Sequence, residues 1–347
     1  EGEVIVDTTK PEISISGLTK GTAYYQLPTV GVTYSDTNAD TSSVTAVLVG
    51  RKGNVFKPAV SGGYLDLSEI PDEAKYDDLY TLTIKGTDLA GNDQTASVEF
   101  ILNRYGSNVD VTGTNYQGRY LQAPVDVDLE ETTVEALNED KTDIKVTLDG
   151  APYSVAPALQ STTRTGGDTG DYVYAYHIDK AAFQKEGTYL IQVVSQTEGG
   201  LDQVSRLSYS FVVDSTNPEL QVSGIRTDAA YRSESRDFTV TPRDMTTVTL
   251  EAQVDGKPMQ LLSDENGIYT GTLPQSTSAH TVVLKATDMA GNVTETTISD
   301  VYVNASTFGQ VINWIRHHVL ATSAAGGILA AAAALIVLAR RRKNADN

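Results

Sequence analysis

The stretch YTLTIKGTDLAGN at residues 80–92 recurs as HTVVLKATDMAGN at residues 280–292, about 200 residues farther along the chain. A shorter, divergent copy, YLIQVVSQT, lies between them at residues 189–197. In the first copy Leu82 and Ile84 alternate with threonines, and this period of two is typical of a strand with one buried face. The spacing therefore predicts a repeating unit of about 100 residues, the size of a small β-sandwich.

Two further landmarks recur in the same order. VIVDTTKPEI at residues 4–13 is matched by FVVDSTNPEL at residues 211–220. A segment of alternating apolar and polar residues ends each time in glycine, which predicts a strand that enters a hairpin. This segment reads VTAVLVG at residues 44–50, IKVTLDG at residues 144–150 and LEAQVDG at residues 250–256.

These landmarks place three repeats at residues 7–103, 104–213 and 214–304. Residues 1–6 are interpreted as the end of a preceding repeat, so the sequence is expected to begin inside a longer protein. Linkers are nearly absent, and a proline near the start of a repeat stiffens the joint because its φ is fixed.

A tight turn is predicted after the repeated strand. Glycine adopts positive φ readily, and Asp and Asn side chains close such turns by bonding to the backbone. The turn residues are Asp88, Gly91, Asn92, Asp288, Gly291 and Asn292.

Tyr80 and Tyr189 stand two residues before the first inward aliphatic side chain of their strands. In immunoglobulin folds this is the place of the tyrosine-corner residue, whose hydroxyl bonds to the backbone upstream. His280 takes this place in the third repeat.

Several segments resemble bacterial immunoglobulin-like repeats: DSTNP at residues 214–218, DMAGN at 288–292, NRYGS at 103–107, YAYHI at 174–178 and GTY at 187–189. Such repeats occur in large surface proteins of Gram-positive bacteria, and the resemblance covers about residues 1–304. For these residues it implies three tandem immunoglobulin-like β-sandwiches. Together with the apolar run described below, the expected fold class is all-β, with three sandwiches followed by a single transmembrane α-helix. The resemblance implies no single function, because such repeats serve adhesins, stalks and surface enzymes alike.

The composition of the chain excludes some classes of partner and of site. The chain has 347 residues and a formal net charge of −19, and an acidic body of this kind repels nucleic acid. There is no cysteine, which excludes thiol chemistry and cysteine-based zinc sites. No signal peptide is recognised at the first residues.

A membrane anchor is predicted near the C-terminus. Residues 319–339 carry no charge and are long enough to cross the hydrocarbon core of a bilayer. By the positive-inside rule the basic cluster that follows, within the tail at residues 340–347, is cytoplasmic and the N-terminal body is extracellular. Residues 305–318 are expected to form an amphipathic juxtamembrane helix. The anchoring side chains are Trp314, Arg340, Arg341, Arg342 and Lys343.

LPQST at residues 273–277 resembles a sortase sorting signal but departs from it at its last two positions and lies far from the apolar span. It aligns with Ile70 and Pro71 of the first repeat, so it is assigned to a loop of the third sandwich. Covalent attachment to the cell wall is therefore not expected.

No catalytic motif was found in the sequence, and no cofactor is expected. The histidines are interpreted as strand or loop residues, and paired acidic residues as solvated charge. Calcium is the one candidate ion, because acidic loops at the joints between repeats could supply oxygen ligands. The candidate ligands are Asp7, Asp88, Asp93, Asp214 and Asp288, although turn formation alone accounts for Asp88 and Asp288.

Three functions remain open. The favoured one is a non-catalytic extracellular stalk that anchors and presents an N-terminal region at the bacterial surface. The second is an adhesin-type module for glycan or host protein, in which Tyr172, Tyr174 and Tyr176 stack on sugars or, alternatively, pack along one face of a strand. The third is the accessory tail of a surface enzyme whose catalytic domain lies upstream.

Overall fold

The computed structural model describes residues 6–156, 158–165, 170–199 and 204–306. Within those ranges, the helical segments are single short turns, and none has the length and apolar character needed to cross a membrane. The span predicted at residues 319–339, the cytoplasmic tail and Trp314 lie outside the described residues, as does nearly all of the juxtamembrane segment.

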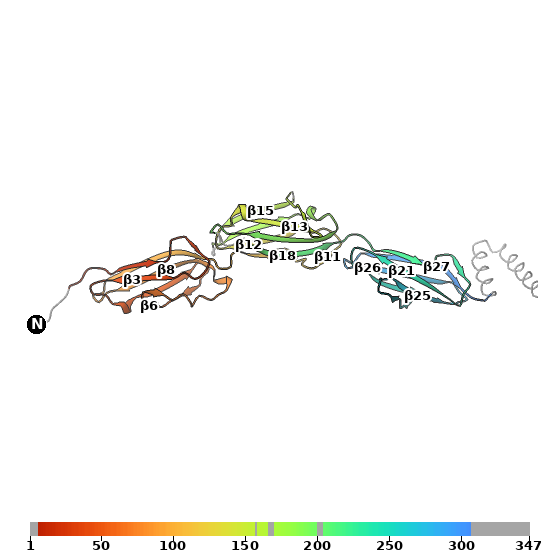
Figure 1. Cartoon of the computed structure of the whole chain (residues 1–347), viewed down its shortest axis with the longest axis horizontal. Helices are drawn as coiled ribbons and strands as arrows, with labels where there is room; N and C mark the ends of the chain where they lie inside the picture. Colours follow the sequence, from red (N-terminus) through yellow and green to blue (C-terminus); the bar gives the residue numbers. More distant parts are fainter. Residues whose placement is uncertain (1–5, 157, 166–169, 200–203, 307–347) are drawn as a thin grey trace, which may run out of the picture. The chain divides into compact units, whose positions relative to one another are not determined.

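The chain folds into three tandem β-sandwiches, as the repeats predicted (Figure 1). Each pairs a four-stranded sheet with a five-stranded sheet. The first two sandwiches form one compact unit, and the third belongs to a second unit.

In the first sandwich, sheet β1-β3-β7-β6 faces sheet β2-β9-β8-β4-β5. The strands are β1 Glu12–Ser16, β2 Ala23–Tyr24, β3 Val30–Ser35, β4 Thr45–Gly50, β5 Val55–Phe56, β6 Val60–Ser61, β7 Tyr64–Leu65, β8 Asp78–Thr87 and β9 Asp93–Leu102, with 3₁₀ turns η1 Thr41–Ser43 and η2 Ala74–Tyr76.

In the second sandwich, sheet β10-β12-β16-β15 faces sheet β11-β18-β17-β13-β14. The strands are β10 Asn108–Val111, β11 Tyr120–Leu121, β12 Val127–Thr133, β13 Asp143–Leu148, β14 Ala151–Tyr153, β15 Leu159–Thr165, β16 Tyr172–Ile178, β17 Gly187–Ser195 and β18 Val204–Val213, with 3₁₀ turns η3 Glu139–Lys141 and η4 Lys180–Phe183.

In the third sandwich, sheet β19-β21-β25-β24 faces sheet β20-β27-β26-β22-β23. The strands are β19 Glu219–Ser223, β20 Ala229–Tyr231, β21 Ser235–Arg243, β22 Thr249–Val254, β23 Lys257–Met259, β24 Leu262–Ser263, β25 Tyr269–Pro274, β26 His280–Thr287 and β27 Val293–Val303.

The predicted hairpins form where glycine ends the alternating segments. Strands β13 and β14 pair through Leu148 and Ala151, and the residues between them, Asp149 and Gly150, have φ of 51° and 79°. Strands β22 and β23 are joined in the same way by an Asp–Gly pair with positive φ. Two central residues with positive φ match the twist of antiparallel strands, so the Asp–Gly sequence fixes the register.

The core of each sandwich lies between its two sheets. Leu82 and Ile84 of β8 are fully buried, as their alternation predicted, and Tyr80 stacks on Phe100 with ring centroids 5.9 Å apart. In the second sandwich Tyr189 and Phe211 form the same stacked pair at 5.6 Å.

The tyrosine corner is present in the first two sandwiches. The Tyr80 hydroxyl donates to the Tyr76 carbonyl, and the Tyr189 hydroxyl donates to the Lys185 carbonyl, each over 2.8 Å. Burial raises the pKa of Tyr189 to about 12. In the third sandwich His280 replaces the tyrosine and reaches the Pro274 carbonyl through Nε2, at 2.9 Å.

One sequence-based assignment is wrong. Leu273 and Pro274 belong to strand β25 and not to a loop, and Leu273 is fully buried. Proline has no backbone amide to donate to a neighbouring strand, so it is tolerated at the end of a strand better than in its middle.

We predict that Tyr80→Phe and Tyr189→Phe each lower the free energy of unfolding by about 1 kcal/mol, because each loses one buried hydrogen bond and leaves a carbonyl without its donor. Differential scanning calorimetry would measure the change. Tyr64→Phe is the control, since the Tyr64 side chain is 60% exposed. Equal stability of all three variants would contradict the role of the corner.

Candidate functional site

Three aspartates meet where the chain enters the first sandwich. Asp7 precedes β1, Asp36 follows β3 and Asp88 follows β8, and one carboxylate oxygen from each lies within 4.8 Å of the others. Two strand ends and the segment that enters the sandwich therefore bring three carboxylates together.

The third sandwich repeats this arrangement with different residues. Asp214 precedes β19, Asp244 follows β21 and Asp288 follows β26, again with carboxylate oxygens within 4.8 Å of one another. We call these two sets the entrance clusters. Asp214 and Asp288 are buried.

The predicted turns hold the entrance clusters in place. Oδ1 of Asp88 accepts from the backbone amides of Ala90 and Asn92 at 2.9 and 2.8 Å, and Gly91 has the positive φ, 91°, that this turn requires. The Asn92 side-chain amide donates to Asp88 Oδ2 at 2.8 Å and to the Asp7 carbonyl at 3.3 Å. The turn therefore ties down the segment that enters the sandwich.

The turn of the third sandwich makes closely similar contacts. Gly291 also has φ of 91°, and Oδ1 of Asp288 accepts from the backbone amide of Asn292 at 2.8 Å. The Asn292 side-chain amide donates to Asp288 Oδ2 and to the Asp214 carbonyl, both at 2.8 Å.

The second sandwich replaces the entrance cluster with neutral groups and one acid. Asn103 follows β9 as Asp214 follows β18, and Thr197 has the same spacing from Tyr189 as Asp88 has from Tyr80. Glu135 supplies the remaining carboxylate, and it accepts from the Asn103 side-chain amide at 3.2 Å. Here a direct hydrogen bond joins groups where the other sandwiches bring carboxylates together.

The pKa values of Asp214 and Asp88 are shifted in opposite directions. Burial, with the nearby carboxylates of Asp244 and Asp288, raises the pKa of Asp214 despite the hydrogen bond from Thr246. Burial also opposes ionisation of Asp88, but the hydrogen bonds from Asn92 and the turn backbone lower the pKa of Asp88 below its ordinary value. A cation would offset the repulsion that Asp214 experiences.

Sequence reasoning found four of the six entrance-cluster aspartates. Asp36 and Asp244 were missed because they belong to no repeated motif, although an alignment of the repeats from Asp7 and Asp214 brings them to nearly the same position. Asp93 lies outside the cluster: it accepts from the Thr87 hydroxyl at 2.6 Å and pairs with Lys85 at 3.2 Å.

The entrance clusters have the chemistry of hard-cation sites. Calcium takes six to eight oxygen ligands from flexible loops, and the three carboxylates of each cluster can supply part of such a shell. Each entrance cluster thus combines negative charge with several carboxylate oxygens at one place.

The tyrosines of β16 are divided between core and surface. Tyr176 is buried and its hydroxyl donates to Glu131 at 2.9 Å. The Tyr174 hydroxyl accepts from the Leu137 amide at 2.9 Å. A groove of about 610 Å³ opens beside β16. It is lined by Tyr172 and Tyr174 together with Ala136, Leu137, Asn138, Glu139, Asp140, Thr163 and Glu198.

A family model described as a bacterial Ig-like domain matches residues 15–104 and 184–304. No curated protein matches the chain.

Solved structures that match the chain include the fibronectin(III)-like modules of Clostridium thermocellum CbhA, with 15% identity, covering 56% of this chain and 94% of that one at a TM-score of 0.26. Dpr2 Ig1-Ig2 in complex with DIP-Theta Ig1-Ig3 shows 12% identity, 85% and 100% coverage and a TM-score of 0.30. Bacteroides ovatus SGBP-B, in complex with a mixed-linkage heptasaccharide, shows 14% identity, 85% and 71% coverage and a TM-score of 0.21. Likenesses this low carry no functional argument.

We predict that millimolar calcium raises the unfolding temperature of the chain, because an ion that binds only the folded state adds about 2.7 kcal/mol at a concentration of 100 Kd. Asp36→Asn and Asp244→Asn should remove this gain. In EDTA, Asp244→Asn should instead stabilise the third sandwich, because it removes one of three like charges. The two signs are measurable by calorimetry.

Asp93→Asn is the matched control and should keep the full calcium response, since Asp93 lies outside the entrance clusters. An identical response to calcium in wild type and in Asp36→Asn/Asp244→Asn would exclude the entrance clusters as the calcium sites.

Proposed function

The chain belongs to the bacterial Ig-like domain family, and we propose that it serves as a non-catalytic extracellular spacer that holds other parts of a surface protein away from the membrane. The observation that carries this proposal is the joint between the first and second sandwiches. A spacer has to keep its units at a fixed relation to each other, and the contacts at this joint suit that task.

Glu135 is the centre of the joint. Its carboxylate is buried and follows β12 of the second sandwich. It accepts from the side chain of Tyr25 in the first sandwich at 3.4 Å, and from that of Asn103, in the segment that links the two sandwiches, at 3.2 Å. It also accepts from the Gly199 amide of its own sandwich at 2.5 Å. One buried carboxylate therefore satisfies donors from both sandwiches, and its loss would leave them unpaired.

The segment that leaves β9 is held from both sides of the joint. The guanidinium of Arg104 pairs with Asp77 at 3.0 Å, and Asp77 also accepts from the Tyr105 amide at 2.8 Å. The carbonyl of Tyr105 accepts from the side chain of Arg206 in the second sandwich, at 2.8 Å.

A second bridge lies apart from Glu135. The ammonium of Lys52 donates to the Asp77 carbonyl at 2.8 Å and pairs with Asp171 of the second sandwich at 3.0 Å. The Asp171 side chain is only 8% exposed, so this ion pair is better shielded than a surface pair and is expected to be more persistent.

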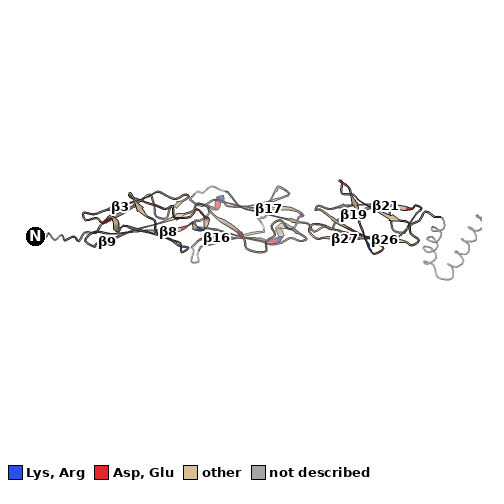
Figure 2. Ribbon diagram, turned by 90° about the horizontal axis from the view of Figure 1, so that it is seen from below, with Lys and Arg blue, Asp and Glu red and all other residues tan. Residues whose placement is uncertain are grey.

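The anchor and the location are part of the proposal. Residues 319–339 would cross the membrane once, with the basic residues that follow on the cytoplasmic side and the acidic body outside, in the manner of a Gram-positive surface protein. The chain carries a formal net charge of −19, and Figure 2 marks its acidic residues in red along the ribbon. This charge would favour solubility over contact with anionic lipid or nucleic acid.

The groove beside β16 favours a second candidate function, an adhesin-type module that binds a neutral glycan. Its two tyrosine rings could stack on sugar faces. The carboxylates of Glu139, Asp140 and Glu198 could accept hydrogen bonds from the sugar hydroxyls. The third candidate, the accessory tail of a surface enzyme, shares the non-catalytic role. Turnover of any substrate by this chain alone would overturn that role.

We predict a single narrow distance distribution between nitroxides on Thr45→Cys in the first sandwich and Lys145→Cys in the second, because the joint is hydrogen-bonded from both sides. The chain has no cysteine of its own, so the two labels are specific. Electron–electron double resonance would measure the distribution, and Glu135→Ala should broaden it. Glu139→Ala, an exposed change in the same sandwich, is the control. A broad distribution in the parent protein would refute the spacer.

We predict that any glycan bound by the chain on an array loses up to about tenfold in affinity in Tyr172→Ala, because an aromatic contact contributes about 0.5–1.5 kcal/mol. Tyr64→Ala, an exposed tyrosine of the first sandwich, should have no effect. Absence of binding to every glycan would remove the second candidate and leave the spacer.

A further inference from the structure

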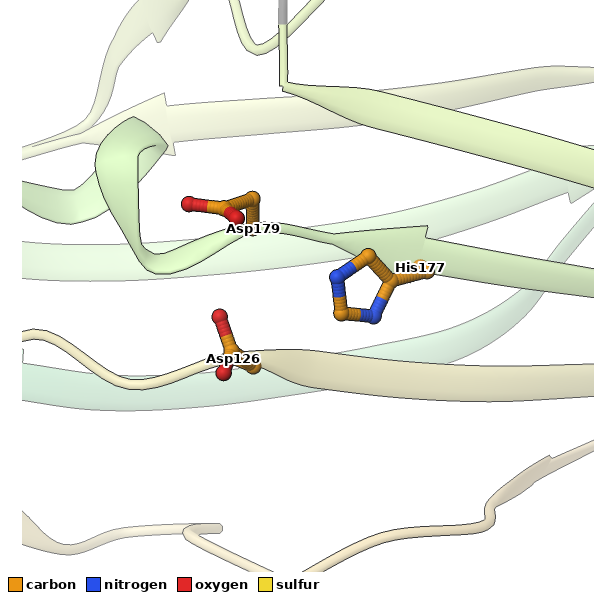
Figure 3. A group of neighbouring side chains, drawn as sticks. All are labelled: Asp126, His177 and Asp179. Carbon is orange, nitrogen blue, oxygen red and sulfur yellow. The ribbon is translucent and has the colours of Figure 1, made fainter.

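His177, on the second sandwich, lies beside three aspartates that belong to neither entrance cluster. Strands β12 and β16 pair so that Asp128 lies opposite His177. Asp126 just precedes β12, and Asp179 lies between β16 and η4. Figure 3 shows the imidazole of His177 facing the space between the carboxylates of Asp126 and Asp179. One ligand atom from each of these three residues lies within 4.8 Å of the others.

The two nitrogens of His177 have distinct partners. Nδ1 lies 2.7 Å from Oδ1 of Asp128. An ionised carboxylate can only accept a hydrogen bond. Nδ1 therefore carries the proton and donates a hydrogen bond to Asp128. In the neutral ring this leaves the lone pair on Nε2. Nε2 is the nitrogen that points toward Asp126 and Asp179 (Figure 3).

The two carboxylates are positioned by the backbone. Oδ1 of Asp126 accepts from the Lys180 amide at 2.8 Å, and Oδ1 of Asp179 accepts from the Ala181 amide at 2.7 Å as the cap of η4. Each bond uses one oxygen and leaves the second oxygen of the same carboxylate for a ligand. The group thus presents one nitrogen and two oxygens from three different points of the chain.

We propose that Asp126, His177 and Asp179 bind a divalent transition-metal ion of the zinc class, with Asp128 orienting the histidine from behind. Imidazole nitrogen suits zinc and its neighbours, whereas calcium and magnesium take oxygen ligands. Three protein ligands leave a fourth position of a tetrahedral zinc ion for water or a group from another molecule. A carboxylate behind the ligating histidine fixes its tautomer and increases its basicity, as is usual in such sites.

The third sandwich provides an internal comparison. Nδ1 of His280 pairs with Asp255 at 2.8 Å, much as His177 pairs with Asp128. Nε2 of His280, however, is occupied by the Pro274 carbonyl at 2.9 Å, and the His280 side chain is only 6% exposed. His280 therefore has the same carboxylate partner but no open nitrogen. The His177 side chain is 39% exposed and its Nε2 faces two carboxylates.

A protonated histidine is the competing explanation. The hydrogen bond to Asp128, together with the charges of Asp128, Asp126 and Asp179, raises the pKa of His177 against a smaller effect of burial. An imidazolium would satisfy the same carboxylates without a metal. The test therefore has to measure binding of the metal and the state of Nε2 directly.

The experiment titrates the chain of residues 1–347 with zinc at a pH above neutrality. Calorimetry follows the binding, and NMR follows the imidazole nitrogens. The chain has four histidines, so His177→Gln identifies the His177 signals by their absence. We expect zinc to shift the Nε2 resonance of His177 and leave its Nδ1 protonated. Asp128→Asn should weaken zinc binding at this site by roughly tenfold, which is at the lower end of the loss of metal affinity seen when a carboxylate that supports a ligating histidine is mutated.

His177→Gln and Asp126→Asn should each abolish the His177-linked binding event, whereas His280→Gln should leave it intact. Asp126 is exposed and His177 lies at the surface, so these variants should keep their calorimetric unfolding transition in EDTA. Equal zinc affinity of wild type and His177→Gln, or an Nε2 resonance that zinc does not move, would overturn the proposal in favour of the protonated histidine.

Discussion

The structure depends on the burial of alternating side chains between two sheets. Once Leu82 and Ile84 face inward, the threonines between them face outward, and a shift of one residue would reverse both faces. The same constraint applies to β17 and β26, which carry the corresponding buried side chains in the second and third sandwiches. The loops carry no such constraint, so their ends are free to hold charge, and the acidic groups collect there.

Sequence reasoning succeeded where the signal is local. The alternating strands, the Asp–Gly hairpins, and the tyrosine corner at Tyr80 and Tyr189 follow from neighbouring residues and were all found. It failed where a group is assembled from distant segments. Asp36, Glu135 and the environment of His177 depend on which strand ends meet, and no spacing in the sequence reports that. The strand at Leu273 was missed because the segment was assigned to a loop from its alignment with Ile70 and Pro71 of the first repeat.

The segment that enters each sandwich is held in one of two ways. The entering segment of the first and third is tied by an asparagine amide, and three carboxylates meet beside it. In the second sandwich an amide and a hydroxyl take two of those places, and Glu135 bonds directly across the joint. The repeat can therefore diverge at its entrance while its core stays the same, because the entrance lies outside the apolar layer.

The parallel pairing of β2 with β9, and of β20 with β27, has a mechanical consequence. In each pair one strand lies near the start of its sandwich and the other is its last strand, and both run in the same direction. Tension applied to the two ends of the chain would therefore pull the strands past each other lengthwise. Hydrogen bonds loaded in this way share the force and break together, whereas bonds peeled from one end would break one at a time.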